Sequence, residues 1–316
     1  MPEERCQTAH RPNESVKGGR SWDCAFAVIL IVPEGHARKS AAETEKFMTE
    51  VGRLKRIAVV TGASSGLGRE YVKLMDERLT THPKEKLDEI WVIARRKDRL
   101  EALQGDVRIP LRVIPLDLTS PSFESEIRHL YETEKPDIAF LINAAGFGKI
   151  GSYADISEQD AGRMVDLNCR APVLMCQMSI PYMNEGARIL NVCSTAAFSS
   201  FQYLGIYCAS KSFLYRYSRA LRVELLKRRI SVTAVCPYWI KDTEFIPVAQ
   251  KTDSHSYIRH FEPASRRATV ARWSMADTIN RFAVSTPGPV CTLHRIFGKI
   301  IPNELMAGIW ALIRRI

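Results

Sequence analysis

The sequence predicts an α/β fold in which one parallel sheet of about seven strands carries helices on both faces. Short apolar runs alternate with longer helical stretches, and the apolar runs have no polar side. Strands that are apolar on both sides belong to sheets that helices cover on both faces. The chain has 316 residues, 46% hydrophobic and 25% charged, which is enough for one large domain with a full core.

The alternation can be followed along the chain. Strands are expected at 56–61, 89–94, 111–116, 137–142, 187–193 and 230–236, and helices at 66–79, 120–133, 157–183 and 205–229. Helices separate most successive strands, so neighbouring strands can run parallel and the sheet can be doubly wound.

Before this pattern, residues 1–47 mix Pro, Gly and Ser without a sustained period. We expect them to form a disordered N-terminal extension to a single folded domain at 48–316. The apolar run at 25–32 is far short of the roughly 20 residues that span a membrane. The eight cysteines show no CxxC pair and no metal-ligand spacing, which predicts reduced thiols, a cytoplasmic location and no metal site.

A glycine-rich turn, Thr61-Gly-Ala-Ser-Ser-Gly-Leu-Gly68, follows the first strand directly and opens a helix. Gly62 permits a tight turn, Gly66 lets the backbone approach a pyrophosphate, and Gly68 lets the helix pack closely. The start of the helix adds oriented N–H groups and a partial positive charge. The segment therefore predicts a Rossmann-type dinucleotide site. Its expected cofactor contacts are Gly62, Ser64, Ser65, Gly66, Leu67 and Gly68.

The end of the second strand, Val92-Ile-Ala-Arg-Arg96, indicates which cofactor binds. A site for NAD(H) usually has an acid here for the ribose 2′-hydroxyl, whereas Arg95 can hold a 2′-phosphate through charged hydrogen bonds. We therefore favour NADP(H) over NAD(H), and expect Arg96 to be a solvated residue at a helix start. Asp117, after the third strand, has two open interpretations: an acceptor for the adenine amino group, or a helix cap before Thr119.

Tyr207 and Lys211 lie four residues apart in a predicted helix, so they share one face and the ammonium can approach the phenol. A nearby cation favours the phenolate, which predicts a pKa of Tyr207 below the usual value of about 10. Tyr207 could then act as a general acid or base. Ser194, at the end of the fifth strand, can hydrogen-bond a substrate oxygen on which charge develops. The three residues predict a catalytic group.

These residues, with others in the same order, give the chain a family resemblance. The segments that carry it are Thr61-Gly-x-x-x-Gly-x-Gly68, Asn143-Ala-Ala-Gly146, Asn168, Ser194, Tyr207-x-x-x-Lys211 and Pro237 to Thr243. Over about residues 55–250 the chain resembles the short-chain dehydrogenase/reductase family. The resemblance implies an enzyme that transfers a hydride between C4 of a nicotinamide and an alcohol or carbonyl carbon.

The resemblance also implies roles for single residues. Asn168 would support a water-linked proton relay, and Lys211 would hold the nicotinamide ribose as well as act on Tyr207. The further cofactor contacts that it implies are Asn143, Ile240 and Thr243. The family also suggests a homodimer or homotetramer formed through the helices at 157–183 and 205–229.

The chain departs from the family pattern at Pro237-Tyr238, where the family commonly has Pro-Gly. We expect a restricted backbone beside the nicotinamide and added aromatic side chains in the pocket. Residues 243–275 are expected to form a lid that combines apolar side chains with several arginines. This combination predicts a large apolar substrate that can carry an acid, such as a hydroxysteroid or a bile-acid-like molecule, and a place in steroid or lipid metabolism.

Two other functions remain open. The enzyme could instead reduce 3-oxoacyl thioesters on an acyl carrier protein, or general aldehydes and ketones. A protein of another class, a non-catalytic NADP(H) sensor, has the same cofactor site. A sensor has no need of a proton donor, so the intact Ser194, Tyr207 and Lys211 argue against it.

The C-terminal part of the chain is basic: residues 251–316 hold ten Lys or Arg and four acids. Attraction of an anionic substrate, attraction to an acidic membrane surface, and a solvated basic face all remain open. No nucleic-acid recognition module is found. The apolar helix expected at about 303–315 could contact a membrane or a partner subunit, and core packing is an alternative at least as well supported, so that membrane contact is not the favoured interpretation.

Overall fold

The computed structural model describes residues 54–81, 86–252, 257–258 and 261–313. The chain separates into two units, Met1–Gly52 and Arg53–Ile316, and every described residue belongs to the second unit. The disordered extension predicted at 1–47 therefore lies outside the described residues.

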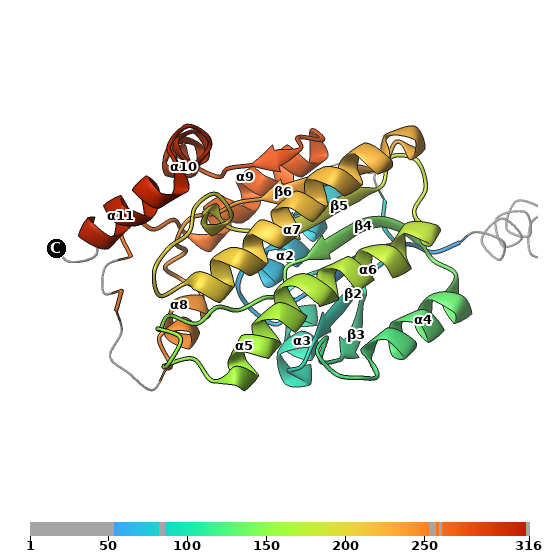
Figure 1. Cartoon of the computed structure of the whole chain (residues 1–316). Coiled ribbons are helices and arrows are strands. Elements are labelled where there is room, and N and C mark those ends of the chain that lie inside the picture. The colour runs from blue at the N-terminus through green and yellow to red at the C-terminus, as the bar shows by residue number, and fades with distance from the viewer. Residues whose placement is uncertain (1–53, 82–85, 253–256, 259–260, 314–316) are drawn as a thin grey trace, which may run out of the picture. The chain divides into compact units, whose positions relative to one another are not determined.

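Seven parallel strands form one sheet in the order β3-β2-β1-β4-β5-β6-β7 (Figure 1). The strands are β1 (Arg56–Thr61), β2 (Glu89–Ala94), β3 (Leu111–Pro115), β4 (Asp137–Asn143), β5 (Arg188–Val192), β6 (Ser231–Val235) and β7 (Val284–Ser285). The predicted doubly wound parallel sheet is confirmed. The strand order reverses between β1 and β4, which is where such sheets bind ligands.

The helices follow the strands in alternation. They are α2 (Gly66–Thr81), α3 (Lys97–Leu103), α4 (Phe123–Glu134), α5 (Glu158–Val165), α6 (Ala171–Ser179), α7 (Gly205–Glu224), α8 (Phe245–Ala249), α9 (Arg267–Ile279), α10 (Pro289–Ile300) and α11 (Asn303–Ile313). The 3₁₀ turns are η2 (Gln104–Asp106), η4 (Ile180–Tyr182), η5 (Thr195–Ala197) and η6 (Leu226–Arg228), and a π-helical turn, η3 (Asp166–Arg170), joins α5 to α6.

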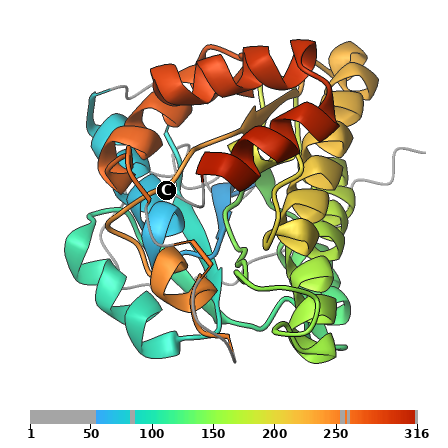
Figure 2. The same cartoon turned by 60° about the vertical axis from the view of Figure 1, so that its left-hand side comes forward.

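Side chains on the strands alternate between two cores, one on each face of the sheet. On β1, Ile57 and Val59 enter the core shared with α4, α6 and α7, whereas Ala58 and Val60 enter the core shared with α2, α3 and α9. Figure 2 shows these two helical layers on either side of the strands. Because both faces of β1 are buried, its sequence is a continuous apolar run rather than an alternating one.

Helix α9 belongs to a layer of the sheet and not to a lid. Its Val270 and Ala271 are buried, and the Tyr71 hydroxyl on α2 lies 2.7 Å from Ser274 Oγ. The lid expected at 243–275 therefore reaches, at most, the residue before Arg267. The last two helices, α10 and α11, lie at the outer edge of the described unit (Figures 1 and 2). Of the helices described, none is long and apolar enough to span a bilayer.

Candidate active site

The glycine-rich turn lies between β1 and α2, at the carboxyl edge of the sheet. Gly62 has a φ of +69°, in the left-handed region, and a Cβ there would lie 2.7 Å from the amide N of Ala145. A Cβ on Gly68 would clash with the carbonyl O of Gly62. Only glycine therefore lets the turn contact both the next loop and the start of α2. The cavity described below is lined by Ser64, Ser65, Gly66 and Leu67, whereas Gly68 does not line it.

Thr61 holds this turn against the loop that follows β4. Its Oγ1 accepts hydrogen bonds from the backbone N–H groups of Ala144, at 3.1 Å, and Ala145, at 3.2 Å. Both amides would otherwise lack an acceptor in a tightly packed place, which would cost free energy. The hydroxyl therefore fixes the two sides of the crevice at the switch point of the sheet.

Asn143 points into the core and not into the cavity. Its Nδ2 donates to Asn191 Oδ1 at 2.8 Å, and Asn191 Nδ2 donates to Ser218 Oγ at 2.9 Å. In the loop after β4, the residues that line the cavity begin with Ala144, one position later. The side chain of Asn143 therefore supports the loop after β4 by holding β4 to β5 and α7. A cofactor contact by this side chain, which the family resemblance implied, does not follow from its position.

Arg95 and Asp117 both line the cavity, at the ends of β2 and β3. The Arg95 side chain is mostly exposed, and its Nη1 lies 3.9 Å from Asp117 Oδ2. Asp117 Oδ1 accepts from the backbone N and the Oγ1 of Thr119. Burial opposes ionisation of Asp117, but the Thr119 hydrogen bonds and the charge of Arg95 keep its pKa below the usual value. The carboxylate therefore caps the turn at Thr119, while α4 starts later, after Ser122.

Arg96 corrects one sequence expectation. Instead of pointing into solvent, its Nη2 donates to Ser65 Oγ at 3.0 Å and to Ser64 Oγ at 3.2 Å. The guanidinium thus lies on the phosphate-binding turn, between the turn and Glu244. The sequence did indicate that the two arginines differ in orientation. Arg95 and Arg96 are adjacent at the end of a strand, so their side chains point in different directions.

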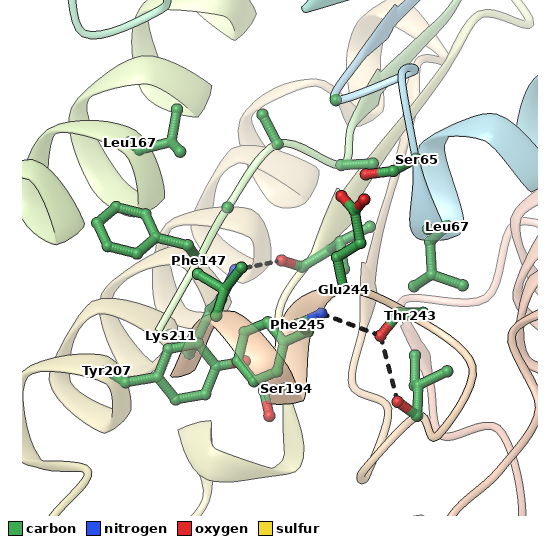
Figure 3. A pocket seen from close by; sticks show the side chains of 18 of the residues that line it. Ser65, Leu67, Phe147, Leu167, Ser194, Tyr207, Lys211, Thr243, Glu244 and Phe245 are labelled. Carbon is green, nitrogen blue, oxygen red and sulfur yellow. Dashed lines mark hydrogen bonds between the residues drawn. The ribbon is translucent and has the colours of Figure 1, made fainter. Parts of the chain in front are cut away.

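Glu244 is the anionic partner of two arginines at this end of the cavity. Its Oε1 lies 2.6 Å from Arg99 Nη1, and its Oε2 lies 2.8 Å from Arg96 Nη1. The guanidinium of Arg99, together with that of Arg96, lowers the pKa of Glu244 to about 2, against a smaller opposing effect of burial. Figure 3 shows Glu244 beside Ser65. Phe245 is the next residue in the chain. The family resemblance indicated Thr243 in the same segment but not Glu244, because no local pattern shows that this carboxylate pairs with Arg96 and Arg99.

Ser194, Tyr207 and Lys211 come together at the other end of the cavity (Figure 3). Ser194 follows β5, and Tyr207 and Lys211 lie one turn apart on α7. All three are more than nine-tenths buried. Lys211 Nζ lies 5.8 Å from the centroid of the Tyr207 ring. Ser194 Oγ accepts from the backbone N of Ala196 at 3.1 Å, which fixes the hydroxyl at the start of η5.

The pKa of Tyr207 is shifted in the direction opposite to the predicted one. Burial raises it above the usual value for a phenol, and a hydrogen bond with Ser194 offsets only part of this rise. Lys211 does not reverse the shift because its Nζ donates to the backbone carbonyl of Val192, at 2.9 Å, and burial lowers the pKa of the ammonium itself. The prediction was wrong because the four-residue spacing shows proximity but not burial.

Asn168 lies in the π-helical turn η3 and is completely buried. Its Oδ1 accepts from Phe147 N at 3.1 Å, and its Nδ2 donates to Phe147 O at 2.8 Å and to Ser210 Oγ at 3.1 Å. The side chain therefore clamps the loop after β4 to α7. Since π-helical turns occur frequently at functional sites, this position agrees with a role in the site, although the side chain itself does not line the cavity.

The segment after β6 closes the cavity from the side of the turn. Thr243 Oγ1 donates to Ile240 O at 3.2 Å and accepts from Phe245 N at 3.4 Å (Figure 3). A Cβ on Gly66 would be 3.8 Å from Thr243 Cγ2, so Thr243 lies directly beside the glycine-rich turn. Ile240 and Thr243 line the cavity, and so does Tyr238, which replaces the glycine common in the family.

One cavity of about 500 Å³ joins these groups. The cofactor residues described above lie at one end, and the other end is mainly aromatic and aliphatic. Residues that line that end are Phe147, Phe201, Leu204, Trp239, Phe245, Val248 and Trp310. The Phe245 ring lies 5.3 Å from the Tyr207 ring, and the Trp310 ring 4.8 Å from the Phe201 ring. Trp310, which comes from α11, was not foreseen from the sequence.

Residues 56–253 match the family model of the short chain dehydrogenases. The chain therefore belongs to the short-chain dehydrogenase/reductase family, as the sequence motifs predicted. It is an oxidoreductase of a family that acts on CH–OH groups with a nicotinamide cofactor, NAD(H) or NADP(H). The turn at Gly62 and Gly68, which only glycine can form, fits the diphosphate of either cofactor.

Similar proteins agree with the family and the fold. An uncharacterised oxidoreductase of Staphylococcus epidermidis is 24% identical over 201 residues, which cover 63% of this chain and 82% of that protein. A short-chain dehydrogenase from Sphingobium yanoikuyae in complex with NADPH superposes with a TM-score of 0.65 at 23% identity, covering 79% of this chain and 95% of the other. A family member from Burkholderia phymatum in complex with NAD gives a TM-score of 0.64 at 18% identity, over 80% and 95% of the two chains.

Proposed function

We propose that the protein transfers a hydride between NADP(H) and the hydroxyl or carbonyl group of a lipophilic substrate, with a hydroxysteroid or a bile-acid-like molecule as the favoured class. The observation that carries the proposal is the single cavity in which the glycine-rich turn and the group Ser194, Tyr207 and Lys211 face the same space. The cofactor, when bound, supplies or accepts the hydride. The residues of the chain bind the cofactor, orient the substrate and transfer the proton.

In the reductive direction, Tyr207 donates its phenolic proton to the carbonyl oxygen as the carbonyl carbon gains the hydride. Ser194 hydrogen-bonds the same oxygen and stabilises the negative charge that develops on it. The Lys211 ammonium lies 5.8 Å from the centroid of the Tyr207 ring, and its hydrogen bond to the Val192 carbonyl fixes the position of the ammonium. Because these groups are buried, water competes weakly with their interactions, and each interaction is stronger than it would be at the surface. Asn168 keeps the loop after β4 in place and, as the family suggests, supports the proton relay.

The preference for NADP(H) is supported by the cations around the glycine-rich turn. Arg96 lies on Ser64 and Ser65, Arg99 lies close by through Glu244, and Arg95 is exposed at the end of β2. Guanidinium groups bind phosphate through paired, charged hydrogen bonds. Two of them, those of Arg95 and Arg96, line the cavity at the expected position of the adenosine ribose and favour a cofactor with a 2′-phosphate. Arg96 joins Arg95 as a proposed contact.

The character of the substrate is proposed from the other end of the cavity. Its lining of aromatic and aliphatic side chains suits a large apolar ring system or chain. The cation of Arg163, which also lines the cavity, acts on Asp117 and so belongs to the cofactor end. A 3-oxoacyl thioester remains the alternative substrate, because an acyl chain would fill the same apolar space, and general aldehydes or ketones come next.

The proposal is tested by the absorbance loss of NADPH with the purified protein. The panel contains oxo-steroids, oxo-bile acids, 3-oxoacyl thioesters and simple aldehydes and bulky ketones. We expect selective turnover of the steroid set, and a loss of at least about a hundredfold for Tyr207→Phe, because general acid catalysis contributes roughly that factor. Turnover of the thioesters alone would show that the substrate is a 3-oxoacyl thioester and not a steroid.

Cofactor affinity is the control in this experiment. Tyr207→Phe should bind NADPH nearly as tightly as the wild type, since the phenol is far from the phosphates. Retained turnover in this variant would refute the role of Tyr207. Tight NADPH binding with no turnover of any compound in the panel would favour the non-catalytic sensor.

The cofactor preference has its own test, the dissociation constants of NADPH and NADH. We expect Arg96→Ala to weaken NADPH binding by about tenfold or more and NADH binding much less, because a charged hydrogen bond is worth about 1.5–3 kcal/mol. Arg95→Asp should shift the preference towards NADH by repelling the 2′-phosphate. The matched control is Arg108→Ala, a mostly exposed arginine outside the cavity that pairs with Asp76. An unchanged ratio of the two constants in both cavity variants would remove these arginines from cofactor selection.

A further inference from the structure

The last two helices present an unusual apolar surface. Leu293, Ile296, Phe297 and Ile300 recur at intervals of three and four residues on one side of α10, and Leu305, Ile309 and Leu312 do so on α11. All seven are exposed, Ile300 by 74% and Leu312 by 64%. We call these seven residues the C-terminal apolar face. A soluble helix normally turns such a stripe towards the core.

Both helices already use their opposite sides to pack on the domain. On α10, Cys291 is buried and the His294 ring contacts the rings of Phe198 and Phe201. On α11, Trp310 packs on Phe201. The helices are therefore fixed to the segment after β5 by one side, and the C-terminal apolar face is a second side that the described residues leave exposed. Patches of this kind mark contacts with proteins or membranes.

The charges around the face distinguish between these partners. The two helices carry Arg295 and Lys299 and a single acid, Glu304. In the sequence, Arg314 and Arg315, outside the described residues, continue this cationic bias. A two-fold contact with a second copy of the chain would bring the same cations together, which disfavours it. An anionic lipid surface complements them, and its acyl region accepts the apolar side chains.

We propose that the C-terminal apolar face binds the surface of a lipid bilayer that contains anionic headgroups. The helices lie in the plane of the interface, the seven apolar side chains enter the acyl boundary, and Arg295 and Lys299 contact the headgroups. The contact is peripheral, because no described helix can span a bilayer.

This attachment has a consequence for the cavity. Trp310 lines the cavity from the inner side of α11, and Ile309 and Leu312 belong to the outer, apolar side of the same helix. One helix therefore separates the bilayer from the apolar end of the cavity. Resting on the proposed function, this arrangement lets a lipophilic substrate pass between the bilayer and the cavity. The bilayer contact itself does not depend on that function.

The experiment is co-sedimentation of the full chain with vesicles of phosphatidylcholine, with or without about 30% phosphatidylserine. We expect binding to the anionic vesicles, weaker binding to the neutral ones, and a decrease at high salt. Ile300→Asn and Leu312→Asn should each reduce the partition coefficient by about tenfold, as expected when one large apolar side chain no longer inserts. Val223→Asn, at a 66% exposed apolar residue on α7, is the matched control and should bind like the wild type.

Vesicle binding is read without turnover, so its outcome is independent of the proposed reaction. NADPH affinity of each variant confirms that the domain is folded. The proposal is overturned if the wild type stays in solution with both kinds of vesicle, or if Ile300→Asn and Leu312→Asn bind as the wild type does. It is also overturned if sedimentation velocity shows a dimer that Ile300→Asn converts to a monomer while no vesicle binds, because the face would then join two copies.

Discussion

At the scale of single residues, burial decides the chemistry of Tyr207. The sequence identifies the phenol and its lysine, because a four-residue spacing on a helix places them on one face. It does not show that the ammonium is held by the Val192 carbonyl or that the phenol is enclosed. Burial therefore favours the protonated phenol, which suits the proposed role of Tyr207 as a proton donor.

The pH dependence of the two reaction directions follows from this raised pKa. Reduction needs the protonated phenol, so its rate should stay level from about pH 6 to 9. Oxidation needs the phenolate, whose fraction rises about tenfold per pH unit below the pKa, so its rate should rise throughout this range. Steady-state rates in both directions measure this. A plateau of the oxidation rate below about pH 8 would show that the pKa is lowered instead.

At the scale of elements, the segment from Thr243 to Phe245 links the two ends of the cavity. Thr243 lies beside the glycine-rich turn, Glu244 pairs with Arg96 and Arg99, and Phe245 contacts the Tyr207 ring. Three consecutive residues thus contact the glycine-rich turn, its neighbouring cations and the ring of Tyr207.

Glu244 would compete with the 2′-phosphate of the proposed NADP(H) for the guanidinium groups that it pairs with. We predict that Glu244→Gln tightens NADPH binding by up to about fivefold, the value of a partly exposed ion pair, and changes NADH binding less. Titration of each cofactor by fluorescence measures this. Glu101→Gln, which removes a carboxylate paired with Lys97 on α3, is the control and should leave both affinities unchanged. Weaker NADPH binding in Glu244→Gln would mean that the carboxylate holds the cofactor or its arginines in place.

The sequence predicted the elements that have a local apolar pattern and missed those that depend on tertiary packing. The six predicted strands agree with the structure within about two residues, because a strand buried on both faces is a continuous apolar run. β7 has only two residues, too few for a pattern, and α9 was taken as part of a lid. The π-helical turn at Asn168 leaves no trace in a 3.6-residue period. Glu244 and Trp310 reach the cavity through tertiary packing, which no local pattern records.

At the scale of the whole molecule, a chain of buried amides joins the centre of the sheet to its helices. Asn143 on β4 donates to Asn191 on β5, and Asn191 donates to Ser218 on α7. Both asparagines and the serine are almost completely inaccessible to solvent. Buried polar groups of this kind are stable only while each keeps its partners.

We therefore predict that Asn191→Ala lowers the free energy of unfolding by about 2–4 kcal/mol, because it leaves Asn143 Nδ2 with a weaker partner and opens a space in the core. Denaturant unfolding followed by circular dichroism measures the change. Asn184→Ala, at a partly exposed asparagine that bonds Asp137 at the surface, should cost less than about 1 kcal/mol. Equal effects of the two substitutions would contradict the structural importance of the buried chain.

During synthesis, β1 cannot pair with β4 until the chain between them has been made. Arg56 on β1 meets Asp137 at the start of β4 across 81 residues of chain. A ribosome that adds about 5–20 residues per second needs about 4–16 seconds to synthesise that interval. Once β2 has been made, β1 can pair with it, but until β4 follows the other edge of β1 stays open, where a strand from another chain could bind. The switch point of the finished sheet is thus, in the nascent chain, an edge open to pairing with another chain.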